Sequence, residues 1–198
     1  MRYGIDIFSG AGGLSLGAEM AGIKISTAIE INASAAKTFL RNHKGATVIQ
    51  DDIQGINPLL LHGKNKPVFV IMGGPPCQGF SLSNTRTRNM ENKKNFLFLE
   101  FVRFVQEIRP AWLVLENVWG ITNINEGKTE KMIEECFRAI PGYDHITSSV
   151  LWASDYGVPQ DRRRAIIIGR KGKNKPELPK ATNESVTIYD AIGDLEFL

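Results

Sequence analysis

The sequence predicts an α/β fold in which a mostly parallel sheet carries helices on both faces. Short apolar runs rich in isoleucine and valine alternate with helical patterns along most of the 198 residues, which is the order of elements in parallel α/β proteins. The runs are continuously apolar, as is typical of strands buried on both faces. The length suffices for one domain with a full hydrophobic core and leaves little room for a second.

Seven segments are predicted as strands because they are short, apolar and rich in strand-forming residues. They are residues 4–8, 25–30, 47–49, 68–72, 112–116, 149–152 and 165–168. Helices are predicted at residues 33–41, 96–108 and 129–140, with Thr129 as the N-cap of the last. Residues 1–170 are expected to form one domain, and residues 171–198 a linker followed by the start of another domain.

Composition and charge exclude few classes of protein. Hydrophobic residues make up 42% of the chain and charged residues 23%, as in ordinary globular domains. No apolar run approaches the roughly 20 residues of a membrane span, and no signal peptide precedes the first strand, so a cytoplasmic protein is expected. The net charge of +3 permits a nucleic-acid partner without demonstrating one.

The two cysteines lie in different settings. Cys136 falls on the apolar stripe of the third predicted helix and is interpreted as a core residue, whereas Cys77 lies in a turn of glycines and prolines. The three histidines show no metal-ligand spacing relative to the cysteines, so no metal site is predicted. Both thiols are expected to be reduced.

Chemically useful residues follow the ends of the first five predicted strands. In open parallel sheets, ligands bind in the crevice outside these carboxyl ends. In order, the ends carry the glycine-rich loop 8–14, the pair Glu30-Ile31, the run Asp51-Asp52-Ile53, the turn 73–81 around Cys77, and the run Glu116-Asn117-Val118. Core packing alone does not account for this coincidence, so the sequence predicts a binding site at this edge.

The first three strand ends suit a nucleoside-containing cofactor but leave its class open. A glycine loop that opens a helix lets backbone approach a ligand closely, in dinucleotide and in S-adenosylmethionine (AdoMet) enzymes alike. Glu30 lies 20 residues beyond Gly10, where an acid can accept hydrogen bonds from a ribose in either cofactor. Asp52 suits an adenine amino group, and Asp51 is the alternative that simply caps the turn.

The setting of Cys77 favours a nucleophile. Two prolines precede the thiol and glycines flank the turn, which presents the side chain rigidly at the end of a strand. A thiol attacks as thiolate, so its proton has to be lost before or during the reaction. Because no histidine lies nearby in the sequence, a Cys–His hydrolase is disfavoured.

Four motifs together resemble the DNA (cytosine-5) methyltransferase family. Residues 8–13, 74–78, 116–118 and 160–164 match the signature motifs of that family in its order. The resemblance extends from about residue 4 to residue 169 and continues weakly through residues 188–195. It implies the Rossmann-like fold of AdoMet-dependent methyltransferases and transfer of a methyl group from AdoMet to C5 of cytosine in DNA.

The resemblance also implies roles for four catalytic residues. Cys77 would add to C6 of the cytosine, and a protonated Glu116 in a desolvated pocket would donate to N3. Arg164 would contact O2 of the base, with Arg162 beside it on the same face of a strand-like segment. Arg163 would point the other way, toward solvent or another side chain.

For the cofactor, the resemblance implies an AdoMet pocket built from the strand ends and the start of the helix at 96–108. Glu30 would bind the ribose and Asp52 the adenine amino group, between flanking isoleucines. The full set is Phe8, Ser9, Gly10, Ala11, Gly12, Gly13, Glu30, Ile31, Asp52, Ile53, Pro76 and Leu97.

The implied partner is double-stranded DNA with the target cytosine flipped out, because a base inside the duplex is beyond reach. The basic stretch 81–95 would be the loop that closes over the DNA. The target-recognition domain and the C-terminal motifs of the family are missing. The chain is therefore expected to be a fragment, or one subunit of a split enzyme whose second polypeptide supplies them, and to fold but methylate feebly alone.

Three other functions remain open from the sequence. One is a catalytically silent AdoMet-binding or regulatory partner of the same fold. Another is an RNA cytosine-5 methyltransferase, although the continuation Gly79-Phe80-Ser81 looks more like the DNA branch. The third is a nucleotide-dependent oxidoreductase, which Cys77 and residues 160–164 disfavour. The role in restriction–modification or in regulation is not determined.

Overall fold

The computed structural model describes residues 1–61, 67–76, 97–122, 127–182 and 184–195. Within these residues the strands form one sheet of seven, in the order β3-β2-β1-β4-β5-β7-β6. The strands are β1 (Arg2–Ile7), β2 (Ile23–Ile29), β3 (Thr47–Ile49), β4 (Val68–Gly73), β5 (Trp112–Val118), β6 (Ile146–Trp152) and β7 (Arg163–Arg170). Strands β1 to β5 pair in parallel, whereas β7 pairs antiparallel with both β5 and β6.

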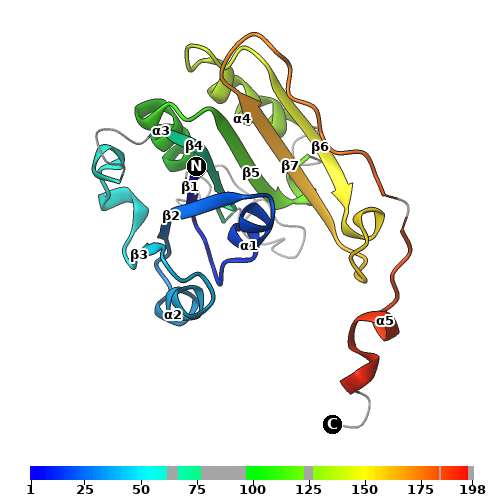
Figure 1. The fold of residues 1–198 in the computed structure, drawn as a ribbon. Helices are drawn as coiled ribbons and strands as arrows, with labels where there is room; N and C mark the ends of the chain where they lie inside the picture. Colours follow the sequence, from blue (N-terminus) through cyan, green and yellow to red (C-terminus); the bar gives the residue numbers. More distant parts are fainter. Residues whose placement is uncertain (62–66, 77–96, 123–126, 183, 196–198) are drawn as a thin grey trace, which may run out of the picture.

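Helices cover both faces of the sheet (Figure 1), which confirms the predicted fold class. The helices are α1 (Gly13–Met20), α2 (Ala33–Asn42), α3 (Leu97–Ile108), α4 (Lys128–Arg138) and the short α5 (Ile188–Ile192). Alternate residues of β4 divide the core: Ile71 packs in the cluster that holds α3 and α4, while Val70 and Met72 pack in the cluster that holds Phe39 of α2. This alternation is why the central strands are apolar throughout.

The start of α4 differs from the prediction. Thr129 is not the N-cap, because the helix begins at Lys128 after Gly127, whose φ of 81° is left-handed. Thr129 instead lies inside the first turn, with 2% of its surface exposed. A glycine reaches this backbone conformation without the steric cost that other residues meet. The helix also ends at Arg138, and residues up to Ile140 continue as a turn.

The last two strands are longer than predicted, because they pair with each other along their length. Trp152 at the end of β6 lies opposite Arg163 at the start of β7, and Ile146 lies opposite Gly169. The predicted helix start at residue 96 lies outside the described residues. None of the helices in the described part of the chain could span a membrane.

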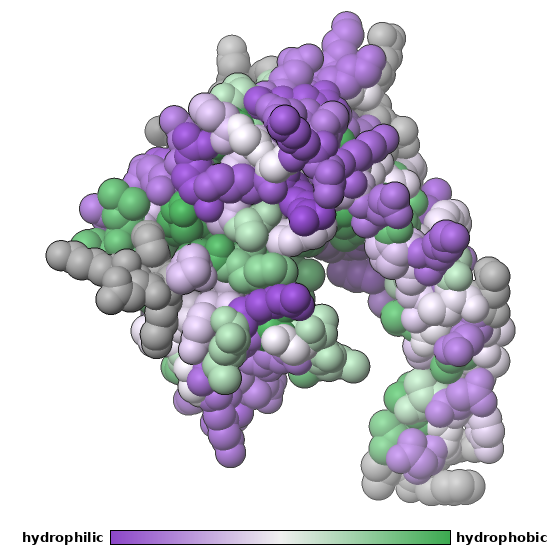
Figure 2. All heavy atoms as spheres, turned by 45° about the horizontal axis from the view of Figure 1, so that its top comes forward, coloured by the Kyte–Doolittle hydropathy of each residue, from purple (hydrophilic) through white to green (hydrophobic). Residues whose placement is uncertain are grey.

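The segment after β7 runs back along β6 before it reaches α5. The hydroxyl of Thr147 donates to Pro176 O at 2.6 Å, and the Tyr156 hydroxyl donates to Pro179 O at 3.0 Å. Beyond these contacts α5 extends away from the sheet (Figure 1), and apolar surface is visible on this arm in Figure 2, where Ile188 and Ile192 are exposed.

Candidate active site

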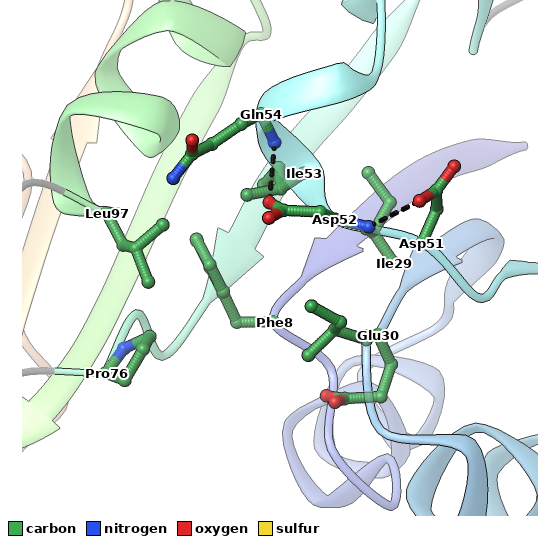
Figure 3. A pocket seen from close by; sticks show the side chains of 10 residues that line it. Phe8, Ile29, Glu30, Asp51, Asp52, Ile53, Gln54, Pro76 and Leu97 are labelled. Carbon is green, nitrogen blue, oxygen red and sulfur yellow. Dashed lines mark hydrogen bonds between the residues drawn. The ribbon is translucent and has the colours of Figure 1, made fainter. Parts of the chain in front are cut away.

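A pocket of about 400 Å³ opens at the carboxyl ends of β1 to β4 (Figure 3). It is lined by Phe8, Ile29, Glu30, Ile31, Asp51, Asp52, Ile53, Gln54, Pro76 and Leu97. Seven of the predicted cofactor residues are in this lining, and they come from five separate elements or loops. The five predicted residues 9–13 are not in it: residues 9–12 lie in the loop between β1 and α1, and Gly13 begins α1. Ile29, Asp51 and Gln54 also line the pocket, although they were not predicted as cofactor residues.

Phe8 enters the pocket from a strained backbone. Its φ of 64° lies in the left-handed region, which costs a bulky residue on the order of 1–3 kcal/mol. This conformation turns the chain out of β1, and the ring points into the pocket between Leu97 and Asp52 (Figure 3). Residues held in such conformations cluster at functional sites, so the backbone conformation of Phe8 indicates a functional site at this end of β1.

Glu30 ties two segments together at the rim of the pocket. Its Oε2 accepts from the backbone N–H of Gly10 at 2.8 Å, and its Oε1 accepts from that of Asn32 at 2.7 Å. The carboxylate therefore holds the glycine loop against the start of α2. Each oxygen of a carboxylate accepts about two hydrogen bonds, so both retain capacity for a ligand hydroxyl.

The two aspartates after β3 both line the pocket. The sequence left open that Asp51 caps the turn after β3, but Asp52 has this role. Asp52 is the residue that caps the 3₁₀ turn Ile53–Gly55, because its Oδ1 accepts from Gln54 N at 3.0 Å. Asp51 Oδ1 accepts from Asp52 N at 2.8 Å (Figure 3). The Oδ2 atom of Asp52 has no hydrogen bond within the described residues and points toward the pocket.

A buried histidine, His43, packs against Gly12 of the glycine loop. In the sequence it had been considered only as a metal ligand. His43 is 3% exposed, and its Nδ1 lies 2.9 Å from Glu19 Oε2. A Cβ at Gly12 would lie 2.1 Å from His43 Nε2, and the φ of Gly12 is 99°. Only glycine therefore fits where the imidazole packs under the loop.

Glu116 and Arg164 lie together where β5 pairs with β7. Arg164 Nε is 2.7 Å from Glu116 Oε1, and Arg164 Nη1 donates to Arg163 O at 2.7 Å. The Glu116 side chain is 31% exposed. Among the described residues a guanidinium faces this acid.

Of the other two arginines of the motif, Arg162 was expected on the same strand face as Arg164, and Arg163 was expected to point the other way. Arg162 is exposed and precedes β7, so the alternation of a strand does not govern it. Arg163 faces other side chains, since its guanidinium carbon lies 4.4 Å from the ring centre of Trp119 and 4.6 Å from that of Trp152. This stacking joins β6, β7 and the 3₁₀ turn Trp119–Thr122 that follows β5.

Asn117 connects the end of β5 to the turn that leads to Cys77. It is 4% exposed, and its Nδ2 donates to Pro75 O at 2.9 Å. Its Oδ1 accepts from Val118 N at 2.8 Å. Cys77 itself and the predicted loop 81–95 lie outside the described residues.

Replacing Asn117 with aspartate is expected to lower the free energy of unfolding by about 2 kcal/mol, because it removes the Nδ2 donor and sets a buried carboxylate against Pro75 O. The measurement is urea unfolding at pH 7.5. The control is Asn57→Asp, since Asn57 only accepts from Leu59 N in an exposed 3₁₀ cap and aspartate accepts equally well there. Equal stability of the two variants would contradict the role assigned to Asn117.

Comparison with known proteins gives one consistent family. The model of the C-5 cytosine-specific DNA methylase family matches residues 3–196. Type II methyltransferase M1.HphI of Haemophilus parahaemolyticus is 40% identical over 193 residues, which cover 96% of this chain and 51% of the relative. Type II methyltransferase M.AquIA of Picosynechococcus is 36% identical over 189 residues, covering 90% of this chain and 76% of the relative.

A solved structure of similar fold comes from an E. coli prophage protein described as a DNA modification methyltransferase. Its TM-score is 0.81 and its sequence identity is 33%, over 97% of this chain and 54% of the other. The structure of S. pombe Dnmt2 methyltransferase, with a TM-score of 0.65 and 18% identity over 89% of this chain and 51% of that one, shares the fold. The chain spans about half the length of most of the curated relatives it matches.

Proposed function

The chain belongs to the C-5 cytosine-specific DNA methylase family, and on that premise we propose that it transfers a methyl group from AdoMet to C5 of cytosine in DNA through a covalent adduct between Cys77 and C6. The observation that carries the proposal is the pocket at the carboxyl ends of β1 to β4. Pro76, which lines this pocket, directly precedes the proposed nucleophile in the sequence, and this supports the proposal.

The chemistry of the pocket fits AdoMet. A volume of about 400 Å³ is in the range of small-molecule sites. Its walls are largely apolar, as an adenine ring requires, and Glu30 and Asp52 supply acceptors for ribose hydroxyls and an adenine amino group. We assign the remaining predicted residues, Ser9 to Gly13, to the methionine end, where the loop lies next to Glu30. Bound AdoMet would supply an electrophilic methyl group.

The protein's own residues would activate the cytosine. Cys77 thiolate forms a bond to C6, and the electron pair of the C5–C6 double bond moves toward C5 as Glu116 donates to N3. C5 then takes the methyl group and loses its proton to solvent water. The electron pair of the C5–H bond re-forms the C5–C6 double bond, and the sulfur–C6 bond breaks to release Cys77 as thiolate. Glu116 lies beside Arg164, which supports this assignment because a protonated acid and a guanidinium at one edge would match N3 and O2 of a pyrimidine. Arg162 would assist from the exposed start of β7.

The substrate we propose is duplex DNA with the target cytosine flipped out. The relatives contain further chain outside the matched region, so a second polypeptide carrying such a region is the proposed partner. The experiment is covalent trapping with a DNA duplex containing 5-fluorocytosine, in the presence of AdoMet, with and without that polypeptide. Fluorine at C5 blocks proton loss, so the adduct accumulates.

We expect wild type to form a denaturant-resistant adduct and Cys77→Ser to form none. The matched control is Cys136→Ser on α4, a partly buried cysteine packed against the core, which should leave the adduct intact. AdoMet binding without any adduct in either arrangement would favour the catalytically silent partner. An adduct with a 5-fluorocytosine RNA but not with DNA would favour the RNA branch.

A further inference from the structure

Arg103 of α3 connects two elements that are far apart in the sequence. Its Nη1 donates to Ile56 O at 3.0 Å, and its Nη2 donates to Ile53 O at 3.0 Å. Its Nε and Nη2 also donate to Glu100 Oε2, at 2.8 and 2.6 Å. One guanidinium therefore binds a carboxylate on its own helix and two backbone carbonyls of the 3₁₀ turn Ile53–Gly55 and the residue after it.

These two elements form neighbouring parts of the pocket wall. Ile53 and Gln54 line it from the 3₁₀ turn, and Leu97 lines it from the first residue of α3 (Figure 3). Arg103 itself is not a lining residue. Its contacts with the turn therefore lie behind the wall of the pocket, where they hold the turn to α3 without touching a ligand.

Among the described residues, the turn has further support from Asp52 and Ile53. It follows β3, an edge strand of only three residues, and its cap comes from the exposed side chain of Asp52. Ile53 is buried at 4% exposure and anchors the turn to the core. The carbonyls at the end of a helical turn carry partial negative charge, so a guanidinium there stabilises the turn.

We propose that Arg103 is a positioning residue that presets the adenine side of the AdoMet pocket by holding the turn 53–56 to α3; the inference rests on the proposed function. The planar fork of arginine reaches two carbonyls and a carboxylate at once, whereas a lysine ammonium on one stem does not reproduce this geometry. Glu100 fixes the orientation of the fork, and Glu107 lies 3.9 Å from Nη1 on the next turn of α3.

The first test uses the chain without added ligand. In Arg103→Met the apolar stem remains but the donors are lost, and amide hydrogen exchange at residues 54–56 is expected to accelerate about tenfold, because the turn opens more often. Exchange in β1 and β4 should stay unchanged. The matched control is Arg138→Met on α4, whose arginine also pairs with a glutamate of its own helix, Glu134, at 2.7 Å but contacts no part of the pocket lining.

The second test is calorimetric titration with AdoMet and, separately, with adenosine. If the competent turn is populated about tenfold less, the Kd of both ligands rises by about the same factor of ten in Arg103→Met. Arg103→Lys should give an intermediate Kd, and Arg138→Met the wild-type Kd. Equal loss for adenosine and AdoMet places the effect on the adenosine side, and unchanged exchange in β1 and β4 separates it from a general loss of stability.

The outcomes separate the two proposals. If wild type binds AdoMet and Arg103→Met binds it equally well, the role of Arg103 is overturned and the proposed function stands. If wild type binds neither ligand, the proposed cofactor is wrong and the inference falls with it. If Arg103→Met does not fold, Arg103→Lys decides: unchanged exchange at residues 54–56 together with an unchanged Kd overturns the inference.

Discussion

Gly73→Ala is expected to lower the free energy of unfolding by more than about 3 kcal/mol, a large part of the stability of an ordinary domain. Gly73 ends β4, and a Cβ there would lie 1.8 Å from Ile7 O and 2.9 Å from Ile7 C. Both partners are backbone atoms of the neighbouring central strand β1. No side-chain rotation relieves such a contact, so the paired strands would have to separate.

The matched control is the same substitution at Gly17. This glycine lies inside α1, and apart from its chain neighbours and the backbone of its own helix no described atom lies within 4 Å of the Cβ position. Alanine is the better helix former by about 1 kcal/mol, so Gly17→Ala is expected to stabilise the protein slightly. Urea and thermal unfolding measure both, and a loss below about 1 kcal/mol at Gly73 would show that β1 and β4 do not approach each other as closely as the structure has them.

Much of this fold was predictable because buried parallel strands leave a strong pattern. Each predicted strand falls within or next to an observed one, since burial on both faces demands an unbroken apolar run. The antiparallel direction of β7 relative to β5 and β6 has no corresponding pattern in the sequence. An apolar run packs equally well in either direction, and the order β5-β7-β6 depends on how the connecting segments cross the sheet.

The site was predictable where it depends on strand ends, and not where it depends on side chains that support it from behind. Phe8, Glu30 and Asp52 could be grouped because the carboxyl ends of parallel strands meet at one edge. Arg103 could not, because an arginine three residues after Glu100 in a helix has the pattern of an ordinary surface pair. Its carbonyl partners lie some 50 residues away in the sequence.

Asp6 illustrates the same limit, because nothing in an Ile-Asp-Ile run shows that its carboxylate is buried under the glycine loop. Asp6 is 1% exposed and accepts from the Ser15 hydroxyl at 2.5 Å through Oδ2, while Oδ1 has no hydrogen bond within the described residues. Burial raises the pKa of Asp6 from 3.8 to about 7, with a smaller raising effect from Glu30 and lowering effects from Ser15 and His43.

The raised pKa fixes the sign of a pH effect on stability. Between pH 4 and pH 7 the folded chain keeps a proton on Asp6 that the unfolded chain has lost, so this group makes stability fall as the pH rises. The full contribution is present below pH 4 and is lost above pH 7. The slope is at most about 1.4 kcal/mol per pH unit, and the whole effect at most about 4 kcal/mol.

Asp6→Asn is therefore expected to gain stability relative to wild type as the pH rises, because asparagine is never charged. Its buried NH₂ group has to find an acceptor, so the variant should be less stable than wild type near pH 4.5, and the difference should shrink and reverse by pH 8. Urea unfolding of both proteins across this range measures this difference.

The control is Asp190→Asn on α5. Hydrogen bonds from Thr187 lower the pKa of this exposed aspartate, so any pH dependence that it adds to stability lies below pH 4. A stability difference between Asp6→Asn and wild type that is independent of pH would mean that Asp6 stays ionised in the folded chain across this range.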